Sequence, residues 1–174
     1  MKTLRLIGTT LLMVVLCLNF TACGDDDDDI DLSPLEGTWG LVRSAGWELC
    51  SEETEKDEWD DSYDPYNPSN DGMDEKLVIK KLTDNSYSVT AYYYSTYSKS
   101  WEPEGNQILT LDGKTLIINK SDDGYFGYGN SVIEALTSEK LVLHMKYDNV
   151  QTDPESDPEH RHSGDFTETF TRME

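Results

Sequence analysis

Apolar and polar residues alternate along several short stretches of this chain, and each stretch ends near residues that favour turns. In LVLHMKY, residues 141–147, the odd positions are Leu141, Leu143, Met145 and Tyr147. Alternation with a period of two is typical of a strand that buries one face. Comparable stretches lie at 37–49, 77–82, 86–97, 107–111, 114–120, 131–137, 140–147 and 165–172. Together they predict about eight β-strands and no long amphipathic helix.

The connections between these stretches are short, which favours pairing of consecutive strands. Asp112-Gly113 separates two alternating runs and is a strong signal for a hairpin. That hairpin is predicted to place Leu109 opposite Leu116. An open sheet would expose two edges, whereas a closed barrel has none. The fold class is therefore predicted as all-β, an antiparallel up-and-down meander closed into a barrel of roughly eight strands.

The alternation also predicts which side chains point into the barrel, although a register error of one residue would invert each set. A barrel of this size is either filled or able to hold one small ligand. Small inward residues such as Ala91 would leave space for a small apolar or amphipathic molecule. The candidate ligand-binding residues are Tyr87, Ala91, Tyr93, Tyr97, Met145, Phe166, Glu168 and Phe170.

The first 22 residues have the features of an export signal. Lys2 and Arg5 precede 15 uncharged residues, 6–20, which are too few for a membrane-spanning helix. Residues 1–22 are therefore excluded from the predicted fold. Residues 23–34 are interpreted as an acidic flexible tether, and residues 35–174 as the β-barrel domain.

The stretch FTACG, which ends the signal, resembles the processing site of bacterial lipoproteins. The resemblance implies that Cys23 is acylated and anchors the chain to a membrane. The acidic run Asp25 to Asp29 that follows resembles the surface-export signal of Bacteroidetes lipoproteins. It implies an outer-membrane lipoprotein displayed at the cell surface. The alternatives are the periplasmic leaflet and an ordinary secretory signal with an incidental cysteine.

The stretch LEGTW, residues 35–39, resembles the start of the first strand in lipocalins and in lipocalin-like lipoproteins of gut Bacteroidetes. In that family an arginine late in the chain packs over the tryptophan of the Gly-x-Trp motif. The resemblance implies that Trp39 and Arg172 close one end of the barrel. The chain differs from true lipocalins in lacking a disulfide pair and a helix before the last strand, and in carrying a long acidic insert.

Charge limits the classes of partner. The chain holds 35 acidic and 14 basic residues, a formal charge of −21 that excludes a nucleic-acid partner. Residues 52–75 contain 11 acids and one base. This acidic loop is predicted to be a solvated flap, and calcium binding through Asp64, Asn67 and Asp71 is the alternative. Val78 stands where an EF-hand would need its chelating glutamate, so the loop is not an EF-hand.

The remaining candidates have competing interpretations. Tyr92, Tyr93, Tyr94 and Trp101 either pair across strands or present an aromatic surface to a glycan. Cys50 is expected to be a buried filler, and His160 with His162 in an acidic loop is not expected to bind zinc. No catalytic constellation is present, so the protein is not expected to be an enzyme. The alternative to ligand binding is a structural module that contacts envelope proteins or glycans.

Overall fold

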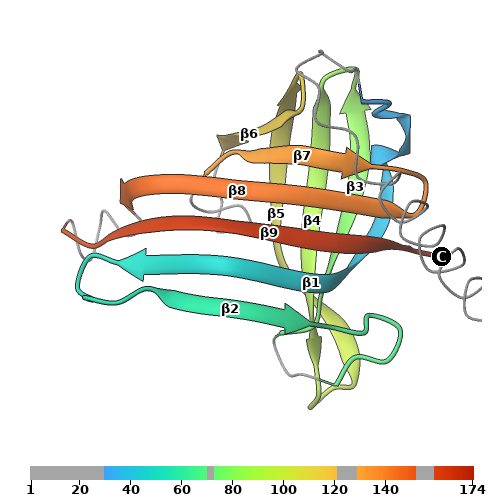
Figure 1. The fold of residues 1–174 in the computed structure, drawn as a ribbon. Helices are drawn as coiled ribbons and strands as arrows, with labels where there is room; N and C mark the ends of the chain where they lie inside the picture. The colour runs from blue at the N-terminus through green and yellow to red at the C-terminus, as the bar shows by residue number, and fades with distance from the viewer. Residues whose placement is uncertain (1–29, 70–72, 121–128, 152–158) are drawn as a thin grey trace, which may run out of the picture.

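A computed structural model describes residues 30–69, 73–120, 129–151 and 159–174 of the chain. A 3₁₀ turn, Ser33–Leu35, precedes nine strands (Figure 1). The strands are β1 Gly37–Cys50, β2 Asp57–Ser62, β3 Glu75–Thr83, β4 Ser86–Ser95, β5 Ser100–Asp112, β6 Thr115–Lys120, β7 Ser131–Leu136, β8 Lys140–Gln151 and β9 Arg161–Met173. The predicted all-β class is confirmed.

Eight of these strands close into an antiparallel barrel. Neighbours in sequence pair in the order β3 to β9, and β1 joins β3 on one side and β9 on the other. The β1–β9 pairing runs the full length of both strands, from Thr38 opposite Met173 to Cys50 opposite His162. The predicted up-and-down meander and its closure are confirmed. In Figure 1 the four strands β2, β1, β9 and β8 lie side by side and cross over β3, β4 and β5.

Strand β2 is additional to the barrel and lies inside the segment predicted to be a solvated flap. It pairs with residues 43–48 of β1, beyond the short stretch 37–40 that pairs with β3. Trp59 explains why this acidic segment forms a strand. Its ring packs 5.5 Å from that of Phe166, and its indole nitrogen donates a hydrogen bond of 2.8 Å to the hydroxyl of Ser44. The acidic residues of β2 stay exposed.

The β5–β6 hairpin differs from its predicted register by two residues. Leu109 lies opposite Ile118, and Leu111 lies opposite Leu116. The turn consists of Gly113 and Lys114, because Gly113 adopts a positive φ of 56° and Asp112 still pairs with Thr115. A shift of two residues keeps every side chain on its predicted face.

The core fills one end of the barrel. The largest fully buried side chains there come from nearly every strand and pack against Leu35 of the 3₁₀ turn. They include Trp39, Leu77, Ile79, Leu109, Leu116, Ile133, Leu141, Leu143 and Phe170. We call this the closed end. The opposite end, where β1 and β8 end and β2 and β9 begin, is called the open end.

In the part of the chain that the structure describes, no helix has the length and apolar character needed to cross a bilayer. The predicted signal peptide, Cys23 and the run Asp25–Asp29 lie outside the described residues.

Candidate functional site

Burial of the inward side chains decreases along β9 from the closed end to the open end. Phe170 is completely buried and Glu168 is 7% exposed, whereas Phe166 is only partly buried. At the start of the strand, the side chain of His162 is 17% exposed and that of Glu48, its hydrogen-bond partner, is 32% exposed. The inward side chains of β9 are therefore less completely buried toward the open end than at the closed end.

The middle of the interior is lined by small or polar side chains. Ala91 and Ser131 are buried among apolar neighbours, and Ser44 lies opposite Glu168 in the β1–β9 ladder. The hydroxyl of Ser131 has no hydrogen-bond partner within the described residues. Buried polar groups in proteins are nearly always hydrogen-bonded, so a hydroxyl of this kind suits a bound molecule or water. This layer is thus buried like the core but less apolar than the closed end.

The electrostatic character of the open half is acidic. Burial raises the pKa of the Tyr63 phenol, and the carboxylates of Asp61, Glu75, Glu168 and Asp74 raise it further. Glu168 and Glu75 both belong to the inward faces of their strands, since they lie opposite Leu143 and Tyr93. A cationic group entering the open half would therefore meet a negative potential.

Aromatic rings form one wall of the open half. The ring of Phe166 lies 5.5 Å from that of Trp59 and 6.2 Å from that of Tyr147. The Tyr147 hydroxyl donates a 2.9 Å hydrogen bond to Glu48, which holds the ring across the sheet. Rings arranged at these distances offer faces and edges to an apolar or cationic group.

The predicted ligand-binding residues separate into two groups. Tyr87, Ala91, Met145 and Phe170 are buried in the core cluster. Phe166 and Glu168 line the open half, and Tyr93 lies near its rim, where its hydroxyl donates to Glu102 at 3.1 Å.

The structure places Tyr97 outside the barrel, which corrects the prediction that it points inward. Its side chain is 98% exposed. Strand β4 ends at Ser95, so the alternation that the sequence suggests does not continue through the turn to β5. Lys99, which closes that turn, has a positive φ of 55°.

Two of the candidate calcium ligands lie in one turn, where the backbone N–H of Asn67 donates to the carbonyl of Asp64 at 3.0 Å. The carboxylate of Asp64 accepts a hydrogen bond from the backbone N–H of Tyr66, and Asn67 is exposed. Asp71 lies outside the described residues. Calcium binding by this loop stays a prediction.

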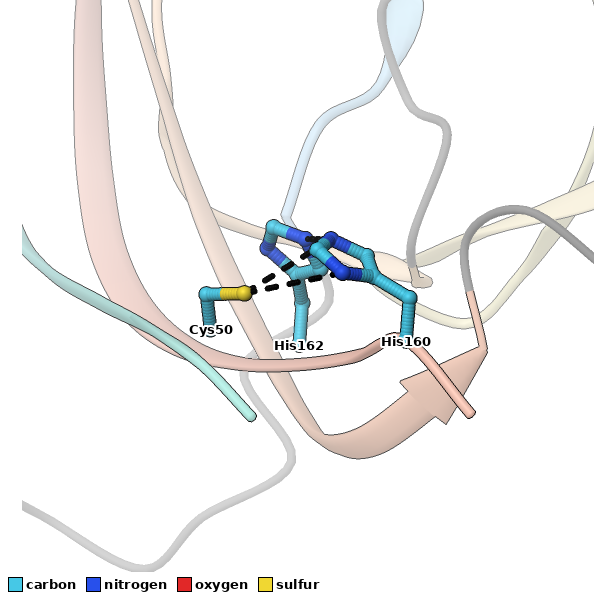
Figure 2. Close-up of side chains that lie close together, drawn as sticks. All are labelled: Cys50, His160 and His162. Carbon is cyan, nitrogen blue, oxygen red and sulfur yellow. Dashed lines mark hydrogen bonds between the residues drawn. The ribbon is translucent and has the colours of Figure 1, made fainter. Parts of the chain in front are cut away.

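A different group of metal-ligating side chains does come together. Cys50, His160 and His162 place a sulfur and two ring nitrogens within 4.8 Å of one another at the open end (Figure 2). Sequence reasoning missed this cluster because Cys50 and His160 are 110 positions apart. The His-x-His spacing was the available signal, since alternate residues of a strand share a face.

The outward aromatic residues of β4 and β5 pack on each other. Tyr94 and Trp101 are opposite one another, with ring centroids 5.6 Å apart. The Lys76 ammonium lies 4.8 Å from the Trp101 ring and 5.1 Å from the Tyr92 ring, and burial lowers the pKa of Lys76. These contacts are those of cross-strand stabilisation. A glycan or envelope partner at this surface stays a prediction.

No family model matches the sequence, and no curated protein matches it. Among solved structures, a siderocalin, Ex-FABP, described as functioning through dual ligand specificities, is 10% identical, with a TM-score of 0.45. That match covers 81% of this chain and 71% of the siderocalin. A second, EF1p2_mFAP2b bound to DFHBI, is 13% identical with a TM-score of 0.41, covering 80% of this chain and 94% of that one.

Proposed function

We propose that this protein is a binding module whose barrel takes one small amphipathic molecule through the open end. The observation that carries this proposal is the contrast between the two halves of the interior. The closed end is filled by fully buried apolar side chains, whereas the open half combines the buried carboxylate of Glu168 with small residues and an aromatic wall. A barrel needs no such layer for stability.

The chemistry of this half favours a ligand with a cationic end. The carboxylates of Glu168, Glu75 and Asp74 act on this part of the barrel with a negative potential, which would attract a ligand ammonium. The rings of Trp59, Phe166 and Tyr147 would contact the apolar part of the same molecule. The ligand class proposed is therefore a small organic cation with an apolar chain or ring.

We further propose that the chain is a surface lipoprotein anchored through Cys23. The described chain enters the fold at the closed end, where Leu35 and Trp39 are fully buried. A tether attached there would connect the membrane anchor to the closed end.

The test compares three alkyl probes of the same chain length: a trimethylammonium, an alcohol and a carboxylate. We expect purified protein to bind the cation at least about tenfold more tightly than the alcohol, and the carboxylate least well, as followed by tryptophan fluorescence. Glu168→Gln should remove the preference for the cation and keep binding of the alcohol. Phe166→Ala should weaken all three.

Glu104→Gln is the matched control, because Glu104 is an exposed carboxylate on β5. It should leave the order of affinities unchanged. The proposal fails if none of the probes binds, or if Glu168→Gln and Glu104→Gln change the three affinities equally. Native mass spectrometry of protein purified without detergent should then show the bare mass of the chain.

A further inference from the structure

Three side chains with a preference for transition metals converge at the open end. Cys50 is the last residue of β1, His162 is the second residue of β9, and His160 directly precedes that strand. Figure 2 shows the Cys50 sulfur and the two imidazole rings turned toward one another. The sulfur lies 3.6 Å from Nε2 of His160, and that nitrogen lies 2.7 Å from Nε2 of His162.

The backbone fixes this convergence. Cys50 and His162 are direct partners in the β1–β9 ladder, so their side chains leave the same face of the sheet. The next residue, Ser51, donates its N–H to the carbonyl of Arg161 at 2.8 Å and accepts a bond from the Arg161 N–H at 3.0 Å. The three side chains are therefore held by paired strand ends rather than by a free loop.

A carboxylate orients the imidazole ring of His162. Nδ1 of His162 donates to Glu48 at 2.7 Å, and the same carboxylate oxygen accepts the Tyr147 hydroxyl at 2.9 Å. Nδ1 of His160 lies 4.0 Å from the carboxylate of Glu52. In metal sites, a histidine ligand almost always donates its second ring nitrogen to a carboxylate or carbonyl in this way. The Cys50 sulfur lies 3.6 Å from Nε2 and 3.7 Å from Nδ1 of the His160 ring.

We propose that Cys50, His160 and His162 bind a zinc ion through Sγ and the two Nε2 atoms. Zinc bonds are about 2.3 Å long to sulfur and about 2.05 Å long to nitrogen. In a tetrahedral site, a sulfur and a nitrogen ligand are then about 3.5 Å apart, and two nitrogen ligands about 3.3 Å apart. The sulfur to His160 distance of 3.6 Å already fits. The two nitrogens, now 2.7 Å apart, need to separate by about 0.6 Å, a small rotation of the rings.

The donor set distinguishes zinc from the calcium considered for the acidic loop. Calcium and magnesium take oxygen ligands, whereas one thiolate and two imidazoles suit zinc. Binding displaces the thiol proton of Cys50 to solvent and forms the sulfur–zinc bond. The fourth position is left to a water molecule. This inference is independent of whether the barrel binds an organic molecule.

A zinc ion here would fasten the two long hairpins of the barrel to each other. Cys50 belongs to the β1–β2 hairpin, and both histidines belong to the β8–β9 hairpin. The Trp59, Phe166 and Tyr147 rings lie on the same two hairpins. The metal would therefore clamp the ends of β1 and β9, which the ladder already pairs, at the rim of the open end.

The experiment measures zinc uptake by the purified, tag-free protein in competition with a chromophoric chelator. We expect one zinc ion per chain. Cys50→Ser and His162→Ala should each lower the affinity at least about a hundredfold, and Glu48→Gln about 10- to 100-fold. His144→Gln is the matched control, because His144 is the remaining histidine of the chain and pairs with Asp165 and Glu134 instead.

Cobalt and a ligand swap separate coordination from a folding defect. With Co²⁺, the parent should show a thiolate-to-cobalt charge-transfer band, which Cys50→Ser should lack. Cys50→His should retain metal without that band, and zinc should raise the thermal midpoint of the parent but not of Cys50→Ser. Absence of zinc uptake, an equal loss in His144→Gln and His162→Ala, or a persistent charge-transfer band in Cys50→Ser would overturn the proposal.

Discussion

The guanidinium carbon of Arg172 lies 4.4 Å from the centroid of the Trp39 ring. The two residues are also direct partners in the β1–β9 ladder. The Arg172 side chain donates to the carbonyls of Pro34, Glu36 and Ser138, and the Trp39 indole donates to the Leu35 carbonyl at 2.9 Å. One arginine therefore joins the 3₁₀ turn, the β7–β8 turn and the last strand over a buried ring.

We expect Arg172→Ala to destabilise the fold by about 3 kcal/mol. The loss combines a cation–π contact of about 0.5–2 kcal/mol with several charge-assisted hydrogen bonds. Arg172→Lys keeps the charge but not the planar fork, so it should recover only part of the loss. Urea denaturation measures the free energy of unfolding.

Arg43→Ala is the control, because the ion pair of Arg43 with Asp60 is exposed. Its free energy of unfolding should stay close to that of the parent. Equal losses at the two arginines would refute this role.

Gly37 of the Gly-x-Trp motif is expected to depend on Arg172. Its φ is +152°, and a Cβ there would collide with the guanidinium. Gly37→Ala should therefore cost roughly 2 kcal/mol, part from the backbone and part from the displaced arginine. In the Arg172→Ala background the collision is gone, so the double variant should lose about 1 kcal/mol less than the sum of the singles. Strict additivity would show that the glycine is needed for backbone reasons alone.

The faces of the strands were largely predictable from the sequence, because period-two alternation reports burial directly. In β8, the inward positions Leu141, Leu143, Met145 and Tyr147 are all buried as expected. Strand β2 was not predicted, because its acids gave it the composition of a loop, and the contacts of Trp59 with Phe166 and Ser44 that anchor it are long-range. Tyr97 was assigned inward because local alternation contains no signal for the end of β4.

The candidate metal cluster could not be predicted from local sequence patterns either, because it depends on long-range strand pairing. His160 and His162 share a face only because β9 extends back to Arg161, and Cys50 reaches them only through the register that closes the barrel. The sequence shows the side chains that could bind a metal, but it does not show that closure of the barrel brings them together. By contrast, the inward direction of Phe166 and Glu168 follows from the alternation of residues along β9 and could be predicted.

The Tyr63 phenol should ionise above its ordinary pKa of about 10. Burial and then Asp61, Glu75, Glu168 and Asp74 favour the neutral form in the folded state. Because the folded pKa is raised, this contribution to stability is complete below pH 10 and is lost as the pH rises through the folded pKa. The stability of the parent should therefore fall more steeply above about pH 10 than that of Tyr63→Phe.

The measurement is an ultraviolet titration of phenolate absorption, parent minus Tyr63→Phe. The midpoint of the difference should lie above 10, and Glu75→Gln should move it down, because one of the carboxylates is neutralised. Tyr97→Phe is the control, because Tyr97 is fully solvated. A difference midpoint at or below 10 would show that the open half is not acidic in solution.

Anchoring through Cys23 predicts the location of the barrel. Strand β1 begins 14 residues after Cys23, at the closed end. In cells of a bacterium with a lipoprotein pathway, Cys23→Ser should move the protein from the membrane fraction to the soluble fraction. Replacing Asp25–Asp29 by asparagines should keep it in the membrane but shield it from protease added to intact cells. If external protease still digests that variant in intact cells, the acidic run does not direct surface export. If Cys23→Ser stays in the membrane fraction, the anchor lies elsewhere.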